Sequence, residues 1–374
     1  MIRHQRFVVG DRARFIAWTF AIVGALAVAA GLVLDPQRTW PNLLLNGYYM
    51  VALALGGMVF IALEHLCGAS WSTDIRRVPE AMMSALPIAA LLMVMLFFGR
   101  EWLYAADRAV AHTSPSKAVY LSTPFFFGRM VVFIAIWIAF ALAMRRASLQ
   151  QDLRALPGHH RHLVRFSGAF IVVFAISFSL ASFDWLMTLT RDWSSTIFAI
   201  YAFAGLFVGG LAAITLAVVL LLERGYLKDV VTEEHLHDLG KLLFAFSIFW
   251  AYIWFSQYLL IWYGNLPDET QYYMARTGTR WTALFLVNLV VNWVVPFLVL
   301  MPRETKRNPN VLKWISIVIL AGRWLDLYLA VMPAVTPSPG VRVLDLLIAS
   351  GYAAVFFLLM ARALSQAPLV PARN

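Results

Sequence analysis

The chain has 374 residues, of which 61% are apolar and only 13% are charged. A soluble domain is typically about 45–50% apolar and about 25% charged, so this composition excludes a water-soluble domain, a disordered chain and a typical nucleic-acid binder. The formal net charge is +10, and Cys67 is the single cysteine. One cysteine excludes, within this chain, a disulfide, a Cys-ligated iron–sulfur cluster, a Cys-rich zinc site and a C-x-x-C-H haem site.

Ten apolar runs are long enough to cross a membrane, because such a helix needs about 20 mainly apolar residues. They lie at residues 15–34, 43–65, 81–99, 124–144, 164–187, 196–222, 240–262, 281–301, 311–332 and 343–362. Backbone groups in hydrocarbon must be paired within the structure, and the runs lack the alternation of a membrane β-barrel. We therefore expect an all-α integral membrane protein, with residues 1–374 forming one polytopic domain.

The distribution of Lys and Arg predicts the orientation of these spans. With the N-terminus in the cytoplasm, the inner segments hold 20 of the 30 basic residues and the outer segments hold 8, Arg38 among them. This bias favours both termini in the cytoplasm, and it explains the basic net charge without nucleic acid. Pro87 and Pro296 fall inside predicted spans and predict kinks there. The longest loops, 100–123 and 263–280, lie outside and are aromatic, which suits an interface layer or a partner surface.

The histidines argue against a haem held by this chain alone. A membrane b-type haem needs two histidines on facing helices at matching depth. The eight histidines stand at positions 4, 65, 112, 159, 160, 162, 235 and 237. Only His65 lies near a span, at the inner end of the second. We expect no redox cofactor in this chain, so electrons would have to pass through partner subunits.

Polar groups at membrane depth are costly, and each is a functional candidate beside the ordinary interpretation as a helix–helix contact. Asp184 lies near the outer end of the fifth span, and it suits either a proton acceptor for a hydroquinone or an anchor at the headgroups. Arg323 and Asp326 share one face of the ninth span, as a proton-path element or a neutralised structural pair. Arg129, near the outer end of the fourth span, either pairs with a carboxylate such as Asp184 or extends to the interface. Asp345 is expected at the interface.

Three further groups are weaker candidates. Glu64 and His65, at the inner end of the second span, suit a proton entry point or solvated polarity. Tyr252, Ser256 and Tyr263 share one face of the seventh span. Two amides of the eighth span, Asn288 and Asn292, are four residues apart. The last two groups suit a hydrogen-bonded wire or a quinone contact, although an aromatic belt and interhelical amide bonds explain them equally well.

Three stretches carry a resemblance to a known family. They read WSTDIRRVPE at 71–80, SFDWLMTL at 182–189 followed by WSSTIF at 193–198, and FSQYLLIWYGNLPDET at 255–270. Together they resemble the membrane subunits of the polysulfide-reductase (NrfD/PsrC-like) superfamily. Within it they are most similar to the second, smaller such subunit (ActF-type) of bacterial alternative complex III, a quinol:cytochrome c or electron-acceptor oxidoreductase. The resemblance covers about residues 10–363.

The resemblance implies two four-helix bundles, spans two to five and six to nine, flanked by the first and last spans. The halves would be residues 15–187 and 196–362. It implies a bacterial inner-membrane complex with a related sister subunit, periplasmic iron–sulfur and c-haem subunits, and electron transfer to a cytochrome or a terminal oxidase. The chain itself would contribute to binding of quinol, such as menaquinol, to a proton path, or to both, among membrane lipids.

The resemblance also assigns positions. Asp184 is the acid of the Phe-Asp-Trp motif, and Arg76, Arg77 and Glu80 form the charged motif of a cytoplasmic loop. The chain departs from the family at residues 190–193, which read TRDW where the family usually has an acidic residue, proline, any residue and an aromatic.

Two other function classes remain open from the residues alone. A stand-alone ion or solute transporter would use the mid-membrane charges for its cargo, and transporters often contain broken helices. A structural scaffold would dock partners through loops 100–123 and 263–280, and its intramembrane carboxylates would be dispensable.

Overall fold

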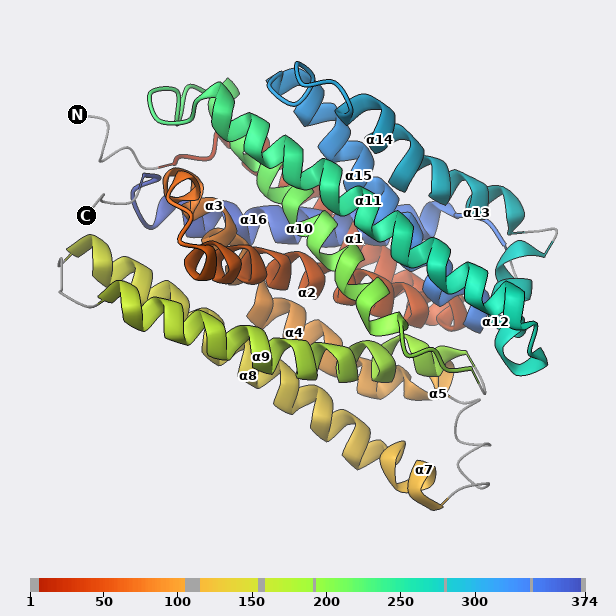
Figure 1. The fold of residues 1–374 in the computed structure, drawn as a ribbon. Helices are drawn as coiled ribbons and strands as arrows, with labels where there is room; N and C mark the ends of the chain where they lie inside the picture. The colour runs from red at the N-terminus through yellow and green to blue at the C-terminus, as the bar shows by residue number, and fades with distance from the viewer. Residues whose placement is uncertain are drawn as a thin grey trace.

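The computed structural model describes residues 7–104, 115–153, 159–190, 193–278, 281–336 and 339–370, with the backbone alone at 152–153 and 159–160. Parts of loop 100–123 and two positions of the 190–193 departure therefore lie outside the described residues. The described part of the chain is all-helical, and ten of its helical segments are long and apolar enough to cross a membrane. This confirms the predicted all-α multi-span architecture (Figure 1).

The first five spans follow the predicted order but reach further than the apolar runs. The second span is one long helix, the third is interrupted by two short 3-10 turns, and a 3-10 turn precedes it. The elements are α1 (Asp11–Leu34), α2 (Pro36–Cys67), η2 (Trp71–Ile75), α3 (Arg77–Met82), η3 (Met83–Ala85), α4 (Leu86–Val94), η4 (Met95–Gly99), α5 (Arg100–Leu103), α7 (Pro115–Tyr120), α8 (Thr123–Leu153), α9 (His159–Trp185) and η6 (Met187–Leu189).

The other five spans include one that contains a π-helical turn. The eighth span is built from α13, η7 and α14, and a short helix, α12, precedes it on the surface. The elements are α10 (Phe198–Glu223), α11 (Glu233–Gly264), α12 (Pro267–Thr277), α13 (Thr282–Leu289), η7 (Val290–Val294), α14 (Val295–Leu300), α15 (Pro309–Val335) and α16 (Val343–Ser365).

The two expected prolines do interrupt their spans. A proline has no N–H to donate and its ring crowds the preceding turn. The η3 turn directly precedes α4 with Pro87, and the η7 turn directly precedes α14 with Pro296. The helices are therefore broken where the sequence predicted, and one of these breaks shapes the candidate site.

Helices contact one another within spans two to five and within spans six to nine, the two groups that the resemblance implies, and extensive contacts also join the groups. In the first group α2 contacts α4 and α9, and α8 contacts α4 and α9 as well. In the second group α10 contacts α11 and α15, and α13 and α14 complete the packing. Helices α2 and α10 join the two groups at the centre (Figure 1). Their axes come close at Gly56 and Gly210, where a Cβ on Gly56 would lie 2.8 Å from Cα of Gly210.

The first and last spans, α1 and α16, pack on one another and against α2. Their crossing also rests on glycine, because a Cβ on Gly24 would lie 2.5 Å from Cα of Gly351. Small residues let membrane helices approach closely and gain van der Waals contact. Phe7 and Leu364 line the same groove, so both ends of the described chain lie on one side. We call that side inner and the opposite side outer; the inner side is the one predicted to be cytoplasmic.

Candidate functional site: a buried polar cluster in the second bundle

An ion pair lies inside the second bundle, in the ninth span. Arg323 and Asp326 of α15 are 3% and 6% exposed, and Nη1 of the arginine is 3.3 Å from Oδ2 of the aspartate. The guanidinium also stacks over the Trp250 ring, 4.1 Å from its centroid. Gly205 of α10 provides the room, because a Cβ there would lie 3.0 Å from Nη1. The expected shared face therefore points into the bundle.

Two amides of the eighth span complete this pair into a closed ring. Asn288 donates to Oδ1 of Asp326 at 2.9 Å, and Nε of Arg323 donates to Oδ1 of Asn292 at 2.7 Å. Asn292 in turn donates to Oδ1 of Asn288 at 2.7 Å. The four candidate residues, two from each span, thus form one buried network. We call it, with Arg276 and Tyr201 described below, the outer cluster.

The π-helical turn η7 carries Asn292 into this ring. Pro296 cannot donate a backbone hydrogen bond to Asn292, the residue four before it, and Val295 instead donates to Val290, five before it. Gly322 of α15 makes the approach possible, because a Cβ there would lie 2.7 Å from Oδ1 of Asn292. The proline break and this glycine are therefore both needed for the observed geometry.

Arg276 of the surface helix α12 closes the outer side of the cluster. It is 2% exposed, and its Nε and Nη2 donate to the carbonyls of Leu329 and Ala330, each at 2.8 Å. The Leu329 carbonyl is free to accept because Pro333, four residues on, has no N–H. The guanidinium lies 3.4 Å from the centroid of the Tyr272 ring. Burial lowers the pKa of Arg276, although a guanidinium remains charged at any physiological pH.

Two small cavities adjoin Asp326, each with a volume of about 20 Å³. The outer cavity is lined by Arg276, Tyr272 and Asn288, and the other reaches Tyr48 in the middle of the bundle. Asp326, Tyr201 and Ala330 line both. A cavity of about 10–15 Å³ or more on this measure holds a water when polar partners are present. The outer cluster therefore has room for about one water on each side of Asp326 and no room for a quinone ring.

Arg323 supplies donors to the second cavity. Nη1 is engaged in the ion pair with Asp326, whereas Nη2 is buried without a hydrogen-bond acceptor among the described residues. An unsatisfied buried donor costs about 1–3 kcal/mol, more when it is charged, so a water here would be strongly favoured. Water bound to Arg323 would connect the cavity to Asp326.

A second buried ion pair joins two of the candidates in the first bundle. Nε of Arg129 donates to Oδ2 of Asp184 at 2.9 Å, and the aspartate is fully buried. The guanidinium also lies 3.7 Å from the Tyr120 ring centroid and 4.5 Å from that of Phe125. Burial and the Asp184 carboxylate raise the pKa of Tyr120 to about 12, so its hydroxyl stays protonated. Of the two possibilities for Arg129, the structure shows the pairing.

Glu64 and His65 lie at the inner end of α2, apart from both ion pairs. Nδ1 of His65 is 2.9 Å from the hydroxyl of Ser167 on α9, and Glu64 is half-buried. The nearby charged motif is also organised: Glu80 pairs with Arg77 at 2.5 Å and with Arg76 at 3.2 Å. This inner group lies in the first bundle, on α2 and the segment that follows it, whereas the outer cluster lies in the second bundle.

The structure does not bring Tyr252, Ser256 and Tyr263 into the cluster. Tyr252 is 65% exposed and Tyr263 is 84% exposed, on the outward-facing side of α11. The buried face of this helix instead carries Trp250, Trp254 and Gln257. Of the alternatives for the first three residues, the exposure of the two tyrosines fits an aromatic belt or an external contact rather than an internal wire.

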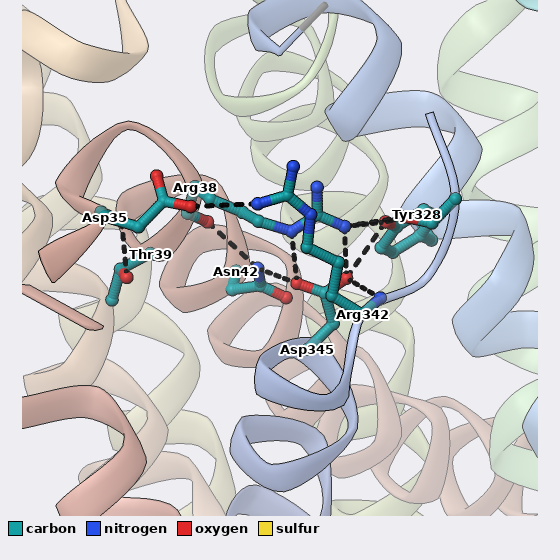
Figure 2. A network of polar contacts seen from close by, with 8 residues as sticks. Asp35, Arg38, Thr39, Asn42, Tyr328, Arg342 and Asp345 are labelled. Atoms are coloured by element: carbon teal, nitrogen blue, oxygen red, sulfur yellow. Dashed lines mark hydrogen bonds and ion pairs between the residues drawn. The ribbon is translucent and has the colours of Figure 1, made fainter. Parts of the chain in front are cut away.

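Sequence reasoning also missed a buried network that includes Asp345 (Figure 2). Asp345 is fully buried, and Nη2 of Arg38 is 2.5 Å from its Oδ2. Asn42 donates to Oδ1 at 2.8 Å and Tyr328 donates to Oδ2 at 3.0 Å. Asp345 is thus enclosed by protein near the end of the last span, and Arg38 is not a loop charge, because α2 already begins at Pro36. Proline at a helix start was the available signal.

A scan of protein-family models and a search of curated proteins found no match to this chain.

Proposed function

We propose that this chain is a transmembrane subunit of a multisubunit quinol oxidoreductase and that its second bundle conducts protons. The three motif stretches support the assignment to alternative complex III-like assemblies of a bacterial inner membrane. Electrons would pass through iron–sulfur and c-haem partner subunits, since this chain offers no ligands for such groups in any motif. The chain would work only within its complex.

The observation that carries the proton path is the position of Asp326 between two cavities of about 20 Å³. A carboxylate can accept a proton from water in one cavity and release it to water in the other. The Arg323 guanidinium lies beside this carboxylate, and the Asn288 amide holds one of its oxygens in place. The same volumes argue against quinol binding in the cluster, so the ring would bind elsewhere, as in a sister subunit.

Asp184 is the second place where a proton could be taken up. It lies near the outer side, where quinol would be oxidised in such complexes, and Tyr120 beside it keeps its hydroxyl proton. In this proposal Asp184 accepts a proton released by quinol at the subunit boundary. A scaffold would need neither carboxylate, and a transporter would move its solute without partners.

Purification from native membranes in mild detergent tests the assignment. A tagged chain should bring with it a related membrane subunit and iron–sulfur and c-haem proteins, seen as a reduced-minus-oxidised haem spectrum. A colourless chain, alone or as a homo-oligomer, would overturn the oxidoreductase assignment. Solute uptake by liposomes that contain this chain alone would then establish a transporter.

A further inference from the structure

An apolar groove separate from the outer cluster runs along α16. Its volume is about 490 Å³, within the range of about 300–1,000 Å³ that ligand sites usually occupy. Its walls come from α2, α10, α15 and α16, and the α16 wall extends from Ala349 to Leu364. At 1.5 Å per residue this is ~22 Å, more than half the ~30 Å thickness of membrane hydrocarbon.

Two polar side chains at the deep end of the groove, Asn46 and Tyr49, already have hydrogen-bond partners. Asn46 accepts from Nε1 of Trp324 at 3.0 Å and donates to the Asn42 carbonyl at 2.8 Å. Tyr49 donates to the carbonyl of Leu320 at 2.8 Å. A polar headgroup placed here would find no free partner among these residues. The deep end therefore suits hydrocarbon.

The inner end of the groove carries a positive charge. Arg224, at the C-terminal end of α10, lines this end and is exposed, and within the described residues no ion pair engages it. Phe7 forms the other side of the opening, 4% exposed and packed against the Tyr226 ring with 5.5 Å between centroids. A cation at the predicted cytoplasmic headgroup level attracts anionic lipid.

We propose that this groove binds one anionic phospholipid, with an acyl chain lying along α16 and the phosphate at Arg224. The apolar walls fit the chain, and the arginine fits the charge of the headgroup. The lipid would fill the space between α16 and the α10–α15 pair and so attach the last span to the second bundle. This site does not depend on the redox assignment.

Native mass spectrometry of the purified complex tests the proposal with phosphatidylglycerol and phosphatidylcholine of identical acyl chains. We expect about one phosphatidylglycerol to remain bound to this chain after delipidation, with weaker binding of phosphatidylcholine. Arg224→Gln should weaken phosphatidylglycerol binding about fivefold, the effect of one basic residue at a membrane surface, and leave phosphatidylcholine binding unchanged. Lys228→Gln is the matched control, because Lys228 is an exposed cation of the adjacent loop that does not line the groove.

A filling variant tests the acyl-chain part. Ala217→Phe should abolish retention of the lipid, whereas Ala245→Phe, on the exposed side of α11, should not. Equal retention in both variants would overturn the proposal. A quinone retained in place of phospholipid would also overturn the proposal. The hydroxyl of Tyr352 in the groove wall is buried without a partner among the described residues, so Tyr352→Phe should then release the quinone.

Discussion

Asp345 and Asp326 are both buried carboxylates, but their surroundings give them different chemistry. Asp345 accepts hydrogen bonds from Arg38, Asn42, Tyr328 and the backbone of Arg342, which saturates both oxygens. Asp326 has fewer partners and adjoins two water-sized cavities. We therefore expect Asp345 to act in stability and Asp326 in proton transfer.

Removing one partner of a buried pair leaves the other charge unpaired and costs about 3–5 kcal/mol. Asp345→Asn should therefore lower the free energy of unfolding in detergent by about this amount. The control is Asp35→Asn, since Asp35 forms a half-exposed pair with Arg342 at 3.2 Å, and such pairs contribute about 1 kcal/mol or less. Similar losses in the two variants would contradict the assigned role of Asp345.

Asp184→Asn removes one partner of a buried pair and should lower stability, but the protein should still fold, because Arg129 keeps its contacts with the rings of Tyr120 and Phe125. If Asp184 accepts a quinol proton, turnover of the intact complex should fall by about 10²-fold, at the low end of general-base effects. The measurement is steady-state quinol oxidation by purified complex. Asp238→Asn is the control, as Asp238 pairs with Lys241 at 2.6 Å on the inner side. Undiminished turnover in Asp184→Asn would remove this residue from the mechanism.

At the scale of helices, the apolar runs predicted all ten spans because hydrophobic length alone determines where a chain crosses a membrane. They did not predict the ends. The second apolar run begins at residue 43, yet α2 begins at Pro36, because Arg38 is neutralised by a distant aspartate. Likewise Arg276 was invisible to span-based reasoning, since it lies in a surface helix and enters the bundle only through tertiary contacts.

The inward faces of helices were predicted only where polar groups pair within the bundle. Arg323, Asp326, Asn288 and Asn292 were predicted from their spacing on single helices, and the structure brings all four together. For the tyrosines of α11 the same spacing left an internal wire, a quinone contact and an aromatic belt open, because outward-facing aromatics have the same spacing as internal ones.

The π-helical turn η7 gives a first prediction at the scale of helices. Pro296→Ala would restore the missing N–H and allow η7 to wind as an α-helix, which would rotate Asn292 away from Arg323. We expect a complex at least as stable to heat, with severalfold lower proton release per electron. Unchanged proton release would show that the π-helical turn has no part in conduction.

The crossing of α1 and α16 gives a second prediction at the scale of helices. A Cβ on Gly24 would meet the backbone of Gly351, so Gly24→Ala should destabilise the protein by about 1–3 kcal/mol through overpacking. Gly128→Ala is the control, since nothing lies within 4 Å of a Cβ there and alanine favours the helix. Thermal unfolding followed by fluorescence would detect the difference, and an unaffected Gly24→Ala variant would contradict the close crossing.

At the scale of the whole molecule, the two bundles meet along α2 and α10, and each contains a buried ion pair. Arg129–Asp184 lies in the first bundle and Arg323–Asp326 in the second. The apolar groove lies beside the second bundle, and Asn46 and Tyr49 at its deep end already have hydrogen-bond partners. In our proposals, this arrangement would separate a proton path through the protein interior from a lipid site at its edge.

Proton release by the reconstituted complex tests the central claim most directly. The wild-type complex, the Asp326→Asn variant and the Asp238→Asn control would each be incorporated in vesicles and supplied with quinol and cytochrome c. The measured quantity is the number of protons released per electron transferred. We expect the Asp326→Asn variant to continue electron transfer but to lose the protons that the wild-type complex carries across the membrane. Wild-type proton release per electron in Asp326→Asn would contradict a path through the outer cluster.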